Sequence, residues 1–315
     1  MSLAVLSALF LTLASPAPSA AAAPPSPREA LVVSTAWLAQ HLKDPDLVLL
    51  HVGEKAEYDE AHIPGARFAD FRALFVSDPG GAGNGLTLEM PSAESLRERL
   101  AAHGISDRSR IVVYFGKDWV SPATRIMFAL DYAGLGDRAS LLDGGQGAWV
   151  RDGQATTAVV PEAKPGSLSP LKIRPIVVTA DYVREHASSS GSVLIDGRDA
   201  SFYDGVQAGG PRDARKAGHI PGAVSVPFTA TTDDKLLLHS TEELRSLFAK
   251  AGVKAGDTII GYCHIGQQAT ASLFAARTLG YKVLLYDGSF EDWARRGYPV
   301  ENPAARTPEP VKDQQ

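Results

Sequence analysis

The stretch DTIIGYCHIGQQATASLF, residues 257–274, holds the only cysteine of the chain and predicts a strand, a tight loop and a helix. Thr258 to Tyr262 is a short apolar run rich in β-branched residues, which is typical of a buried strand. Helix-forming residues run from Ala269 to Leu279, and Gly280 is suited to the end of that helix. Cys263 is therefore expected at the carboxyl end of a strand, where a loop opens into a helix.

This placement favours a reactive role for Cys263. A turn into a helix gathers unpaired N–H donors and the positive end of the helix dipole, which attract an anion. We therefore expect the thiol to have a lowered pKa and to act as a thiolate nucleophile. The alternative is a buried structural cysteine. A single cysteine cannot form an internal disulfide.

Composition and charge exclude several classes of protein. The chain has 315 residues, of which 44% are hydrophobic and 21% charged, and this is typical of a globular protein with two domains. The net charge of -5 and the lack of a long basic run argue against nucleic acid and anionic membranes as partners. Residues 1–23 combine a short apolar run with small residues, which predicts a cleaved signal peptide and a periplasmic or secreted protein without a membrane anchor. The alternative is a disordered, Ala-rich tail.

An internal repeat divides the chain. His-Ile-Pro-Gly-Ala occurs at residues 62–66 and again at residues 219–223. A second pair of matching segments, 142–149 and 286–293, ends each copy with Trp149 and Trp293. Two copies of this size indicate two domains rather than a repeat array. The predicted organisation is a first domain at 28–160, a linker at 161–170, a second domain at 171–302 and a loose tail at 303–315.

Each copy alternates short apolar runs with amphipathic stretches, which predicts an α/β fold with a mostly parallel sheet flanked by helices. Ligands of such sheets bind at the carboxyl ends of the strands, where Cys263 is expected. The expected strands are 47–52, 111–115, 140–142, 193–196, 258–262 and 283–286. The expected helices are 92–103, 121–132, 241–251 and 269–279, the third opened by a capping box of Ser240 and Glu243.

The repeat also serves as an internal control. The loop of the first copy that matches the Cys263 loop, residues 116–122, contains no cysteine. The first domain is therefore expected to be catalytically silent. His62 and His219 occur in both copies, so we interpret them as structural residues that bond the backbone around the Pro-Gly turn. Trp149 and Trp293 are likewise expected in the core.

Residues particular to the second copy are candidate ligands for an anion. Arg198 follows the strand that ends near Asp196, and Arg212 lies in an insertion that the first copy lacks. Both arginines could hold an anionic substrate. Asp196 could orient Arg198 or simply pair with it, and either arginine could instead be a solvated surface residue. His264 could place positive charge beside the thiolate, or could be an exposed loop residue.

These motifs together resemble the tandem-domain rhodanese family of sulfurtransferases over nearly the whole chain after residue 23. The resemblance rests on Tyr58 with the segment 62–66, on 219–223, on the six-residue loop from Cys263 and on 286–293. It implies an inactive first domain and a catalytic second domain, each with a five-stranded parallel sheet. It further implies that Cys263 carries a sulfane sulfur as a persulfide, with no metal or organic cofactor.

The resemblance leaves the sulfur donor open. It implies that the partners of the protein are a small-molecule sulfur donor and a thiol or cyanide acceptor. The loop residues Ile265, Gly266, Gln267 and Gln268 are expected to bind substrate beside His264. The loop matches neither the cationic loop of thiosulfate-using relatives nor the small neutral loop of mercaptopyruvate-using relatives. Arg212 matches an arginine that binds the carboxylate of mercaptopyruvate, whereas Phe202 stands where a second arginine is common. We favour thiosulfate, with 3-mercaptopyruvate as the alternative.

Two other functions deserve comparison. Cysteine phosphatases share this kind of loop but need an arginine at its end, where this chain has Ala269. A phosphate dianion would lack its bidentate ligand there, so a phosphatase is disfavoured. A non-enzymatic periplasmic sulfur carrier is the other alternative, and multiple turnover with a small donor would separate it from an enzyme.

Overall fold

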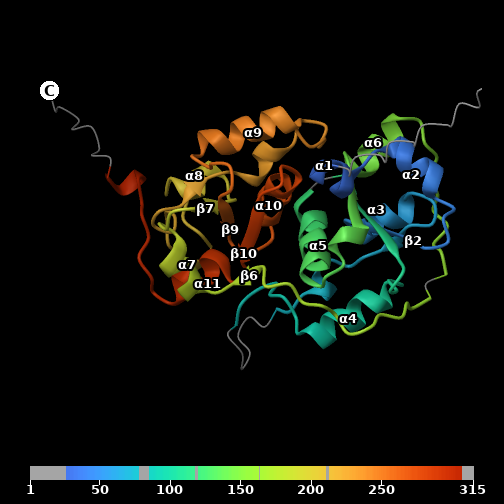
Figure 1. The fold of residues 1–315 in the computed structure, drawn as a ribbon, viewed down its shortest axis with the longest axis horizontal. Coiled ribbons are helices and arrows are strands. Elements are labelled where there is room, and N and C mark those ends of the chain that lie inside the picture. Colours follow the sequence, from blue (N-terminus) through green and yellow to red (C-terminus); the bar gives the residue numbers. More distant parts are fainter. Residues whose placement is uncertain (1–25, 78–84, 118–119, 163, 211–212, 307–315) are drawn as a thin grey trace, which may run out of the picture.

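Two five-stranded parallel sheets form the framework of the molecule (Figure 1). The computed structural model describes residues 26–77, 85–117, 120–162, 164–210 and 213–306. The strand orders are β1-β5-β4-β2-β3 and β6-β10-β9-β7-β8, so the second sheet repeats the first. Every strand pair is parallel, and helices pack on both faces. The predicted α/β class and the tandem arrangement are confirmed.

The first domain contains the following described elements. Its strands are β1 (Val32–Val33), β2 (Leu47–Val52), β3 (Arg67–Phe68), β4 (Arg110–Phe115) and β5 (Ala139–Leu142). Its helices are α1 (Pro27–Leu31), α2 (Thr35–His41), α3 (Lys55–Glu60), α4 (Ala93–Ala102), α5 (Val120–Tyr132) and α6 (Gly145–Arg151).

The second domain follows the same plan. Its strands are β6 (Val177–Val178), β7 (Ser192–Asp196), β8 (Val224–Ser225), β9 (Thr258–Tyr262) and β10 (Lys282–Tyr286). Its helices are α7 (Ala180–His186), α8 (Ala200–Tyr203), α9 (Thr241–Lys250), α10 (Ala269–Thr278) and α11 (Ser289–Arg295).

Each strand and helix that the sequence predicts is present, and both of its ends lie within one residue of the predicted bounds. The capping box of α9 is present, with Ser240 accepting from the Glu243 amide and Glu243 from the Ser240 amide. β1, β3, β6 and β8 were not predicted, because each has two residues and shows no periodicity, and neither were the described α-helices of four to seven residues.

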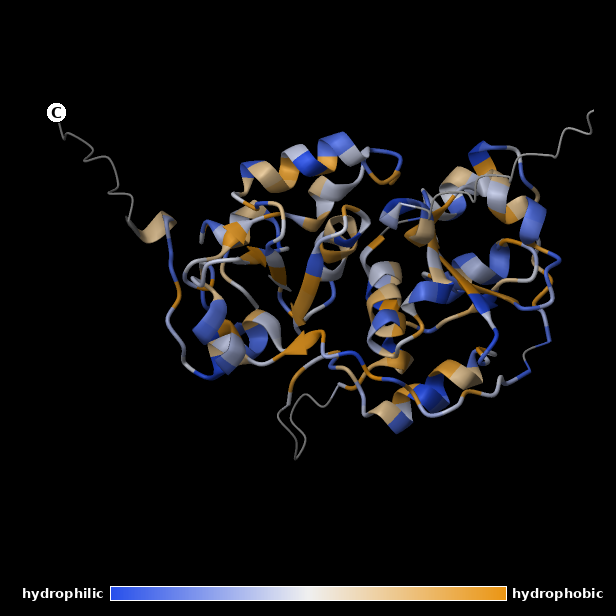
Figure 2. Ribbon diagram, viewed as in Figure 1, coloured by the Kyte–Doolittle hydropathy of each residue, from blue (hydrophilic) through white to orange (hydrophobic). Residues whose placement is uncertain are grey.

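Two helices, α5 and α10, join the domains. Both are buried on nearly all sides, which explains why their sequences are apolar all round rather than amphipathic. At the contact, the hydroxyl groups of Thr124 on α5 and Thr270 on α10 lie 3.0 Å apart. One hydrophobic cluster runs through this contact from β4 in the first domain to β9 in the second. Figure 2 shows hydrophobic colouring on the central strands and on the facing helices.

The repeated histidines are structural, as predicted, although they bond different groups from those expected. His62 is buried, and its Nδ1 and Nε2 lie 2.6 and 3.1 Å from the carbonyl oxygens of Tyr58 and Val159. His219 repeats the first contact with Tyr203 at 2.7 Å. Each ring also stacks on its tyrosine. The tyrosine hydroxyl groups, rather than the histidines, reach across the Pro-Gly turns to the carbonyls of Ala66 and Ala223.

The predicted core tryptophans are buried in both domains. Trp149 donates from Nε1 to the Ala155 carbonyl, and Trp293 donates to that of Pro299. The equivalent bonds show that the tryptophan anchors the strand-like segment after its helix in each copy.

The predictions for the two ends of the chain fall largely on residues that the structure does not describe. The predicted signal peptide lies outside the described residues, and so does most of the tail. Within the predicted tail, Ala304–Arg306 form a short 3-10 helix, and the looseness of the rest stays a prediction. This helix is held there because the Ala304 amide donates to the Asp204 carbonyl and the Ala305 amide to Asn302 Oδ1. Among the described helices, none has both the length and the apolar character required to cross a membrane.

Candidate active site

Cys263 lies where the sequence predicts it, one residue beyond the end of β9 and at the start of the loop that leads to α10. β9 is the central strand of its sheet, between β10 and β7, so the loop opens at the middle of the sheet edge. Gly266 has φ +78°, and a Cβ there would lie 2.7 Å from the Asp287 carbonyl oxygen. Only glycine fits this turn without strain.

The sulfur of Cys263 is fully buried under a ring of amides. The backbone N–H groups of Ala269, Ile265 and Gln268 bond toward it. Burial nevertheless raises the pKa of the Cys263 thiol, because desolvation outweighs the amides, which lower it, and the Asp196 charge raises it further. The expectation of a lowered pKa is therefore wrong for this closed arrangement. The amides stabilise an anion, but the loop excludes the water that would also stabilise it.

The start of α11 fixes the backbone of this loop. Ser289 has φ +52°, and its hydroxyl accepts a bond of 3.2 Å from the Cys263 amide while donating to the Tyr286 carbonyl. The amides of Phe290 and Glu291 donate to the carbonyls of Cys263 and His264, both at 3.0 Å. Sequence reasoning did not assign a role to Ser289, although the repeated segment 286–293 marked its position as special.

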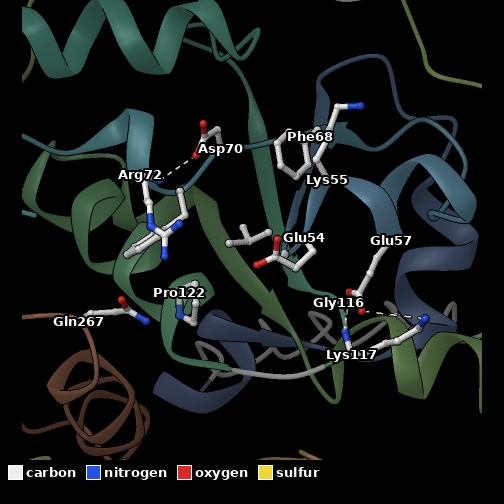
Figure 3. Close-up of a pocket in the computed structure, with 13 residues that line it drawn as sticks. Glu54, Lys55, Glu57, Phe68, Asp70, Arg72, Gly116, Lys117, Pro122 and Gln267 are labelled. Atoms are coloured by element: carbon white, nitrogen blue, oxygen red, sulfur yellow. Dashed lines mark hydrogen bonds and ion pairs between the residues drawn. The ribbon is translucent and has the colours of Figure 1, made fainter.

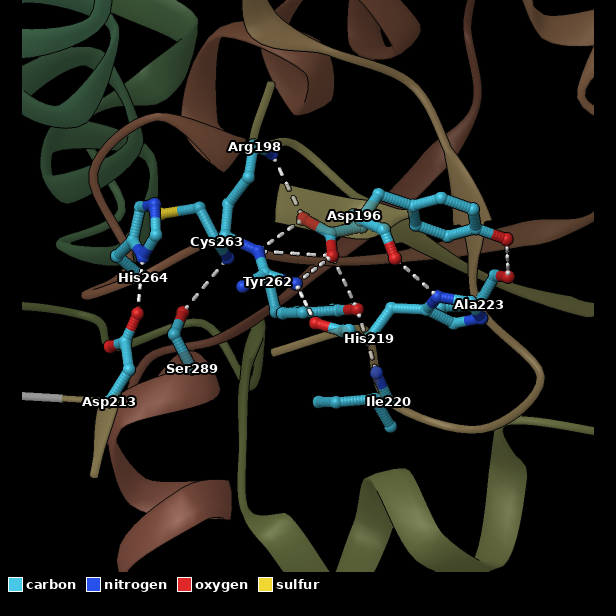
Figure 4. A network of polar contacts seen from close by, with 12 residues as sticks. Asp196, Arg198, Asp213, His219, Ile220, Ala223, Tyr262, Cys263, His264 and Ser289 are labelled. Atoms are coloured by element: carbon cyan, nitrogen blue, oxygen red, sulfur yellow. Dashed lines mark hydrogen bonds and ion pairs between the residues drawn. The ribbon is translucent and has the colours of Figure 1, made fainter. Parts of the chain in front are cut away.

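Asp196 and Arg198 form a buried network beneath the loop (Figure 4). Arg198 Nη2 donates to Asp196 Oδ2 at 2.6 Å and to the Gly218 carbonyl at 2.7 Å. The Tyr262 hydroxyl donates to the same carboxylate at 2.7 Å. The guanidinium packs over the ring of Phe290, 4.1 Å from its centroid. Burial is the largest single influence and lowers the pKa of Arg198, but the charge and hydrogen bonds of Asp196, with smaller effects of Tyr262 and Asp213, together raise this pKa above its usual value.

Arg198 therefore pairs with Asp196, which was the alternative to a role in substrate binding. The side chains of Arg198 and Asp196 are 1% and 0% exposed, so each is the other's counter-ion in a dry environment. A donor-binding role for Arg198 stays a prediction. Arg212, the other predicted clamp, lies outside the described residues.

The other predicted loop residues point in different directions. His264 Nδ1 lies 2.5 Å from Asp213 Oδ2, and its ring meets the edge of Phe202. Gln267 crosses the domain boundary and donates from Nε2 to Ser121 Oγ at 3.2 Å. Ile265 packs against the hydrophobic core. Gln268 has a buried Oε1 without a hydrogen-bond partner among the described residues.

The first domain has a pocket of about 860 Å³ at the equivalent edge of its sheet (Figure 3). Tyr114 and Tyr262 occupy the same position in their sheets, since they pair with His51 and Asp196 respectively. Phe115, which follows Tyr114, therefore occupies the position of Cys263. Gln267 reaches the pocket from the second domain. Charged side chains of both signs line the rest of the pocket: Glu54, Lys55, Glu57, Asp70, Arg72 and Lys117. The matching loop thus has an open pocket and no thiol among its described residues.

A buried histidine lies under this pocket. His51 occupies the register of Asp196, and neither of its ring nitrogens has a partner among the described residues. Desolvation lowers the pKa of His51 to about 4, with a further contribution from His62. His51 is therefore neutral near pH 7, whereas its counterpart Asp196 is a carboxylate paired with Arg198. No group of three or more potential metal ligands occurs in the described part of the chain.

The fold and the loop define a parallel α/β protein with a cysteine cradled at the end of its central strand. The model of the rhodanese-like domain matches residues 34–152 and 179–296, and the chain belongs to that family. This agrees with the resemblance drawn from the sequence motifs.

The similarity to several relatives covers most of this chain. A protein named sulfur carrier protein TtuD from Thermus thermophilus is 32% identical, over 86% of this chain and 96% of its own length. A 3-mercaptopyruvate sulfurtransferase from Escherichia coli is 31% identical, over 85% and 97%. A thiosulfate sulfurtransferase from Rattus norvegicus is 29% identical, over 85% and 93%.

Solved structures support the fold. The structure of an EanB variant in complex with ergothioneine matches with a TM-score of 0.77 and 23% identity, covering 91% of this chain and 72% of that one. At this identity the likeness concerns the arrangement of strands and helices.

Proposed function

We propose that this protein is a sulfurtransferase that moves a sulfane sulfur from a small donor to cyanide or a thiol through a persulfide on Cys263. The observation that carries the proposal is the position of Cys263, directly after the central strand β9, in a loop whose Ala269, Ile265 and Gln268 amides favour negative charge on its sulfur. N–H donors fixed in this way stabilise charge on sulfur without reorganising during the reaction. They would serve a thiolate and the terminal sulfur of a persulfide alike.

The proposed reaction has two displacements. The Cys263 thiolate attacks the outer sulfur of thiosulfate, a new S–S bond forms, and the donor S–S bond breaks with its electron pair leaving on sulfite. Cyanide or a thiolate then attacks the outer sulfur of the persulfide, and the electron pair of that S–S bond returns to Cys263. Because Cys263 is fully buried, neighbouring side chains must move before either partner reaches it.

We favour thiosulfate over 3-mercaptopyruvate as the donor. His264 is partly exposed beside Cys263 and could meet a sulfonate group, while Arg212 remains a candidate second contact. Relatives with both kinds of name match this chain to a similar degree, so the donor has to be decided by experiment.

A mass spectrum of the intact protein after incubation with each donor tests the proposal. We expect one added sulfur atom on the wild-type protein with thiosulfate and none on Cys263→Ser. Subsequent cyanide should remove the sulfur and release thiocyanate. Absence of the added sulfur with both donors would refute the function.

A sulfur carrier that hands its persulfide to a partner protein is the second candidate. It is favoured by the name of the Thermus thermophilus relative, a sulfur carrier protein. The two functions differ in turnover, since an enzyme converts many equivalents of thiosulfate and cyanide per cysteine. A carrier would stop at about one equivalent until its protein partner is added.

A further inference from the structure

The pocket of the first domain contains two charged side chains that have no partner among the described residues. The carboxylate of Glu54 makes no capping bond, although Glu54 is the N-cap residue of α3. The described hydrogen bonds of Arg72 are made by its backbone, whose amide donates to Asp70 Oδ1 and whose carbonyl accepts from the Phe75 amide. Figure 3 shows the Glu54, Arg72 and Gln267 side chains directed toward the middle of the pocket. Within the described part of the chain, an unpaired carboxylate and an unpaired guanidinium thus face the same space.

The two lysines that line the pocket are paired and point away from its middle (Figure 3). Lys55 forms an ion pair with Asp59 and lies over the ring of Phe68, 5.7 Å from its centroid. Lys117 Nζ lies 3.9 Å from Glu57 Oε1, and the Lys117 amide donates to Oε2 of the same carboxylate. Three acidic and three basic residues form the charged part of the described lining, so the pocket has no excess of positive charge to attract a dianion such as thiosulfate.

A buried histidine lies directly beneath the floor of the pocket. A Cβ atom on Gly53 would lie 3.0 Å from His51 Nε2, and one on Gly116 would lie 3.5 Å from it. Both glycines line the pocket, so at these two positions only backbone lies between the imidazole and the cavity. His51 is fully buried, and neither ring nitrogen has a hydrogen-bond partner among the described residues. Such an unpaired group costs free energy, and a polar ligand in the pocket would supply its partner.

The second domain fills the matching space with one of its own side chains. Asp196 occupies the register of His51. Arg198 follows two residues later and donates from Nη2 to the Asp196 carboxylate. In the first domain the residue two positions after His51 is Gly53, which has no side chain. The space that a guanidinium closes in the second domain is thus open to a cationic group of a ligand in the first.

We propose that the first domain is a binding domain for a small zwitterion, whose carboxylate pairs with Arg72 and whose ammonium group pairs with Glu54 above His51. Free amino acids and short peptides share this chemistry. Arginine binds a carboxylate through two parallel hydrogen bonds, and a neutral imidazole accepts from an ammonium group. Because burial lowers the pKa of His51 to about 4, its ring is neutral near pH 7.

The size and the walls of the pocket favour a ligand with an apolar side chain. The volume of about 860 Å³ is that of a small-molecule site. Apolar side chains form part of the wall: Val52, Phe68, Phe71 and Pro122. Cys263 is not among the described residues that line the pocket, so this site is separate from the proposed sulfur transfer, and the inference does not depend on that function.

Isothermal titration calorimetry of the full chain, in the absence of any sulfur donor, tests the proposal. L-leucine should show saturable binding with a dissociation constant below about 1 mM, and L-leucyl-L-leucine should bind more tightly if the natural ligand is a peptide. Isocaproate lacks the ammonium group of leucine, and L-leucinamide lacks its carboxylate. Each should bind about tenfold to hundredfold more weakly than L-leucine, because one charge-assisted bond is lost.

Matched variants assign each charge. Glu54→Gln should weaken L-leucine binding about tenfold or more and leave that of isocaproate unchanged. Arg72→Gln should weaken L-leucine binding likewise and leave that of L-leucinamide unchanged. His51→Phe should also weaken L-leucine binding, because the ring is kept but its acceptor is lost. Lys55→Gln is the control and should bind L-leucine as the wild type does, since Lys55 lines the same pocket but pairs with Asp59.

Absence of saturable binding of both L-leucine and the dipeptide by the wild-type protein would overturn the proposal. So would isocaproate and L-leucinamide that bind as tightly as L-leucine, or equal losses in Lys55→Gln and Glu54→Gln. Glu54 and Arg72 are exposed, so their variants should fold as the wild type does by circular dichroism. If His51→Phe does not fold, these two variants decide the matter. Failure of persulfide formation would refute the proposed sulfur transfer and leave this proposal standing.

Discussion

Replacement of Arg125 by methionine should destabilise the protein strongly, although Arg125 belongs to the first domain, whose own loop holds no cysteine. Its guanidinium is fully buried on α5, where Nη2 donates to Asp287 Oδ1 at 2.5 Å and to the Leu88 carbonyl at 2.6 Å. A methyl group placed on Gly266 would lie 3.5 Å from Arg125 Nη1, so the ion pair sits directly beneath the Cys263 loop.

The magnitude follows from what the substitution leaves behind. Asp287 would become a buried carboxylate whose remaining support is the Met90 amide on Oδ2. Removal of one partner of a buried ion pair costs about 3–5 kcal/mol. The lower end applies here, because Arg125 Nε and Nη1 have no hydrogen-bond partner among the described residues and their burial already costs free energy. Packing of the guanidinium on Phe75 offsets part of that cost.

The assay is urea unfolding followed by circular dichroism and tryptophan fluorescence, with thiosulfate turnover measured in parallel. Arg125→Met should lose about 3 kcal/mol, while the double variant with Asp287→Leu should recover most of it, because the unpaired charge is then gone. Arg174→Met is the matched control at another interdomain ion pair. Arg174 is about half exposed and Asp131 keeps Arg277 as a partner, so its loss should be below about 1 kcal/mol. An Arg125→Met loss no larger than that of Arg174→Met would refute the reasoning.

The remaining predictions concern the site and the chain end. Cys263→Ser should abolish sulfur transfer, since Cys263 is the only cysteine of the chain; substantial turnover by that variant would show that the transfer does not pass through a persulfide of this protein. Alkylation of Cys263 by a neutral reagent should keep rising beyond the usual thiol range near pH 8.5, because burial raises its pKa and the thiolate forms only at higher pH. Arg212→Ala should lower kcat/KM for thiosulfate about tenfold to hundredfold with little change in melting temperature, whereas Arg198→Ala should also lower that temperature by leaving Asp196 unpaired. Intact mass of protein from the native host should show loss of residues 1–23, and retained Met1 would exclude export.

The sequence could predict the position of Cys263 because local patterns determine it. A β-branched run, a glycine-bearing loop and a helix-forming segment are each readable within a few residues. The repeat then separated scaffold from chemistry, and the buried His62, His219, Trp149 and Trp293 agree with that separation.

The sequence could not predict contacts between distant segments. Asp213 and His264 are 51 positions apart, and Arg125 and Asp287 are 162 apart, so neither pair leaves a local pattern. The raised pKa of Cys263 has the same origin. The loop amides are local and suggest a thiolate, but burial depends on how α11, β7 and the first domain pack around the loop.

These contacts give a physical reason for a first domain whose own loop has no thiol among its described residues. The segment after residue 84 reaches the second domain, where Thr87 bonds Glu291 and Met90 bonds Asp287. Glu291 in turn bonds the carbonyl of His264, and Arg125 supports the loop from below at Gly266. The first domain thus supplies the buried guanidinium of Arg125 and the amides of Thr87 and Met90, which hold the Cys263 loop and the start of α11 in place. A second domain expressed alone would leave Asp287 and Glu291 without these partners, so we expect it to lose the ordered loop before it loses its sheet.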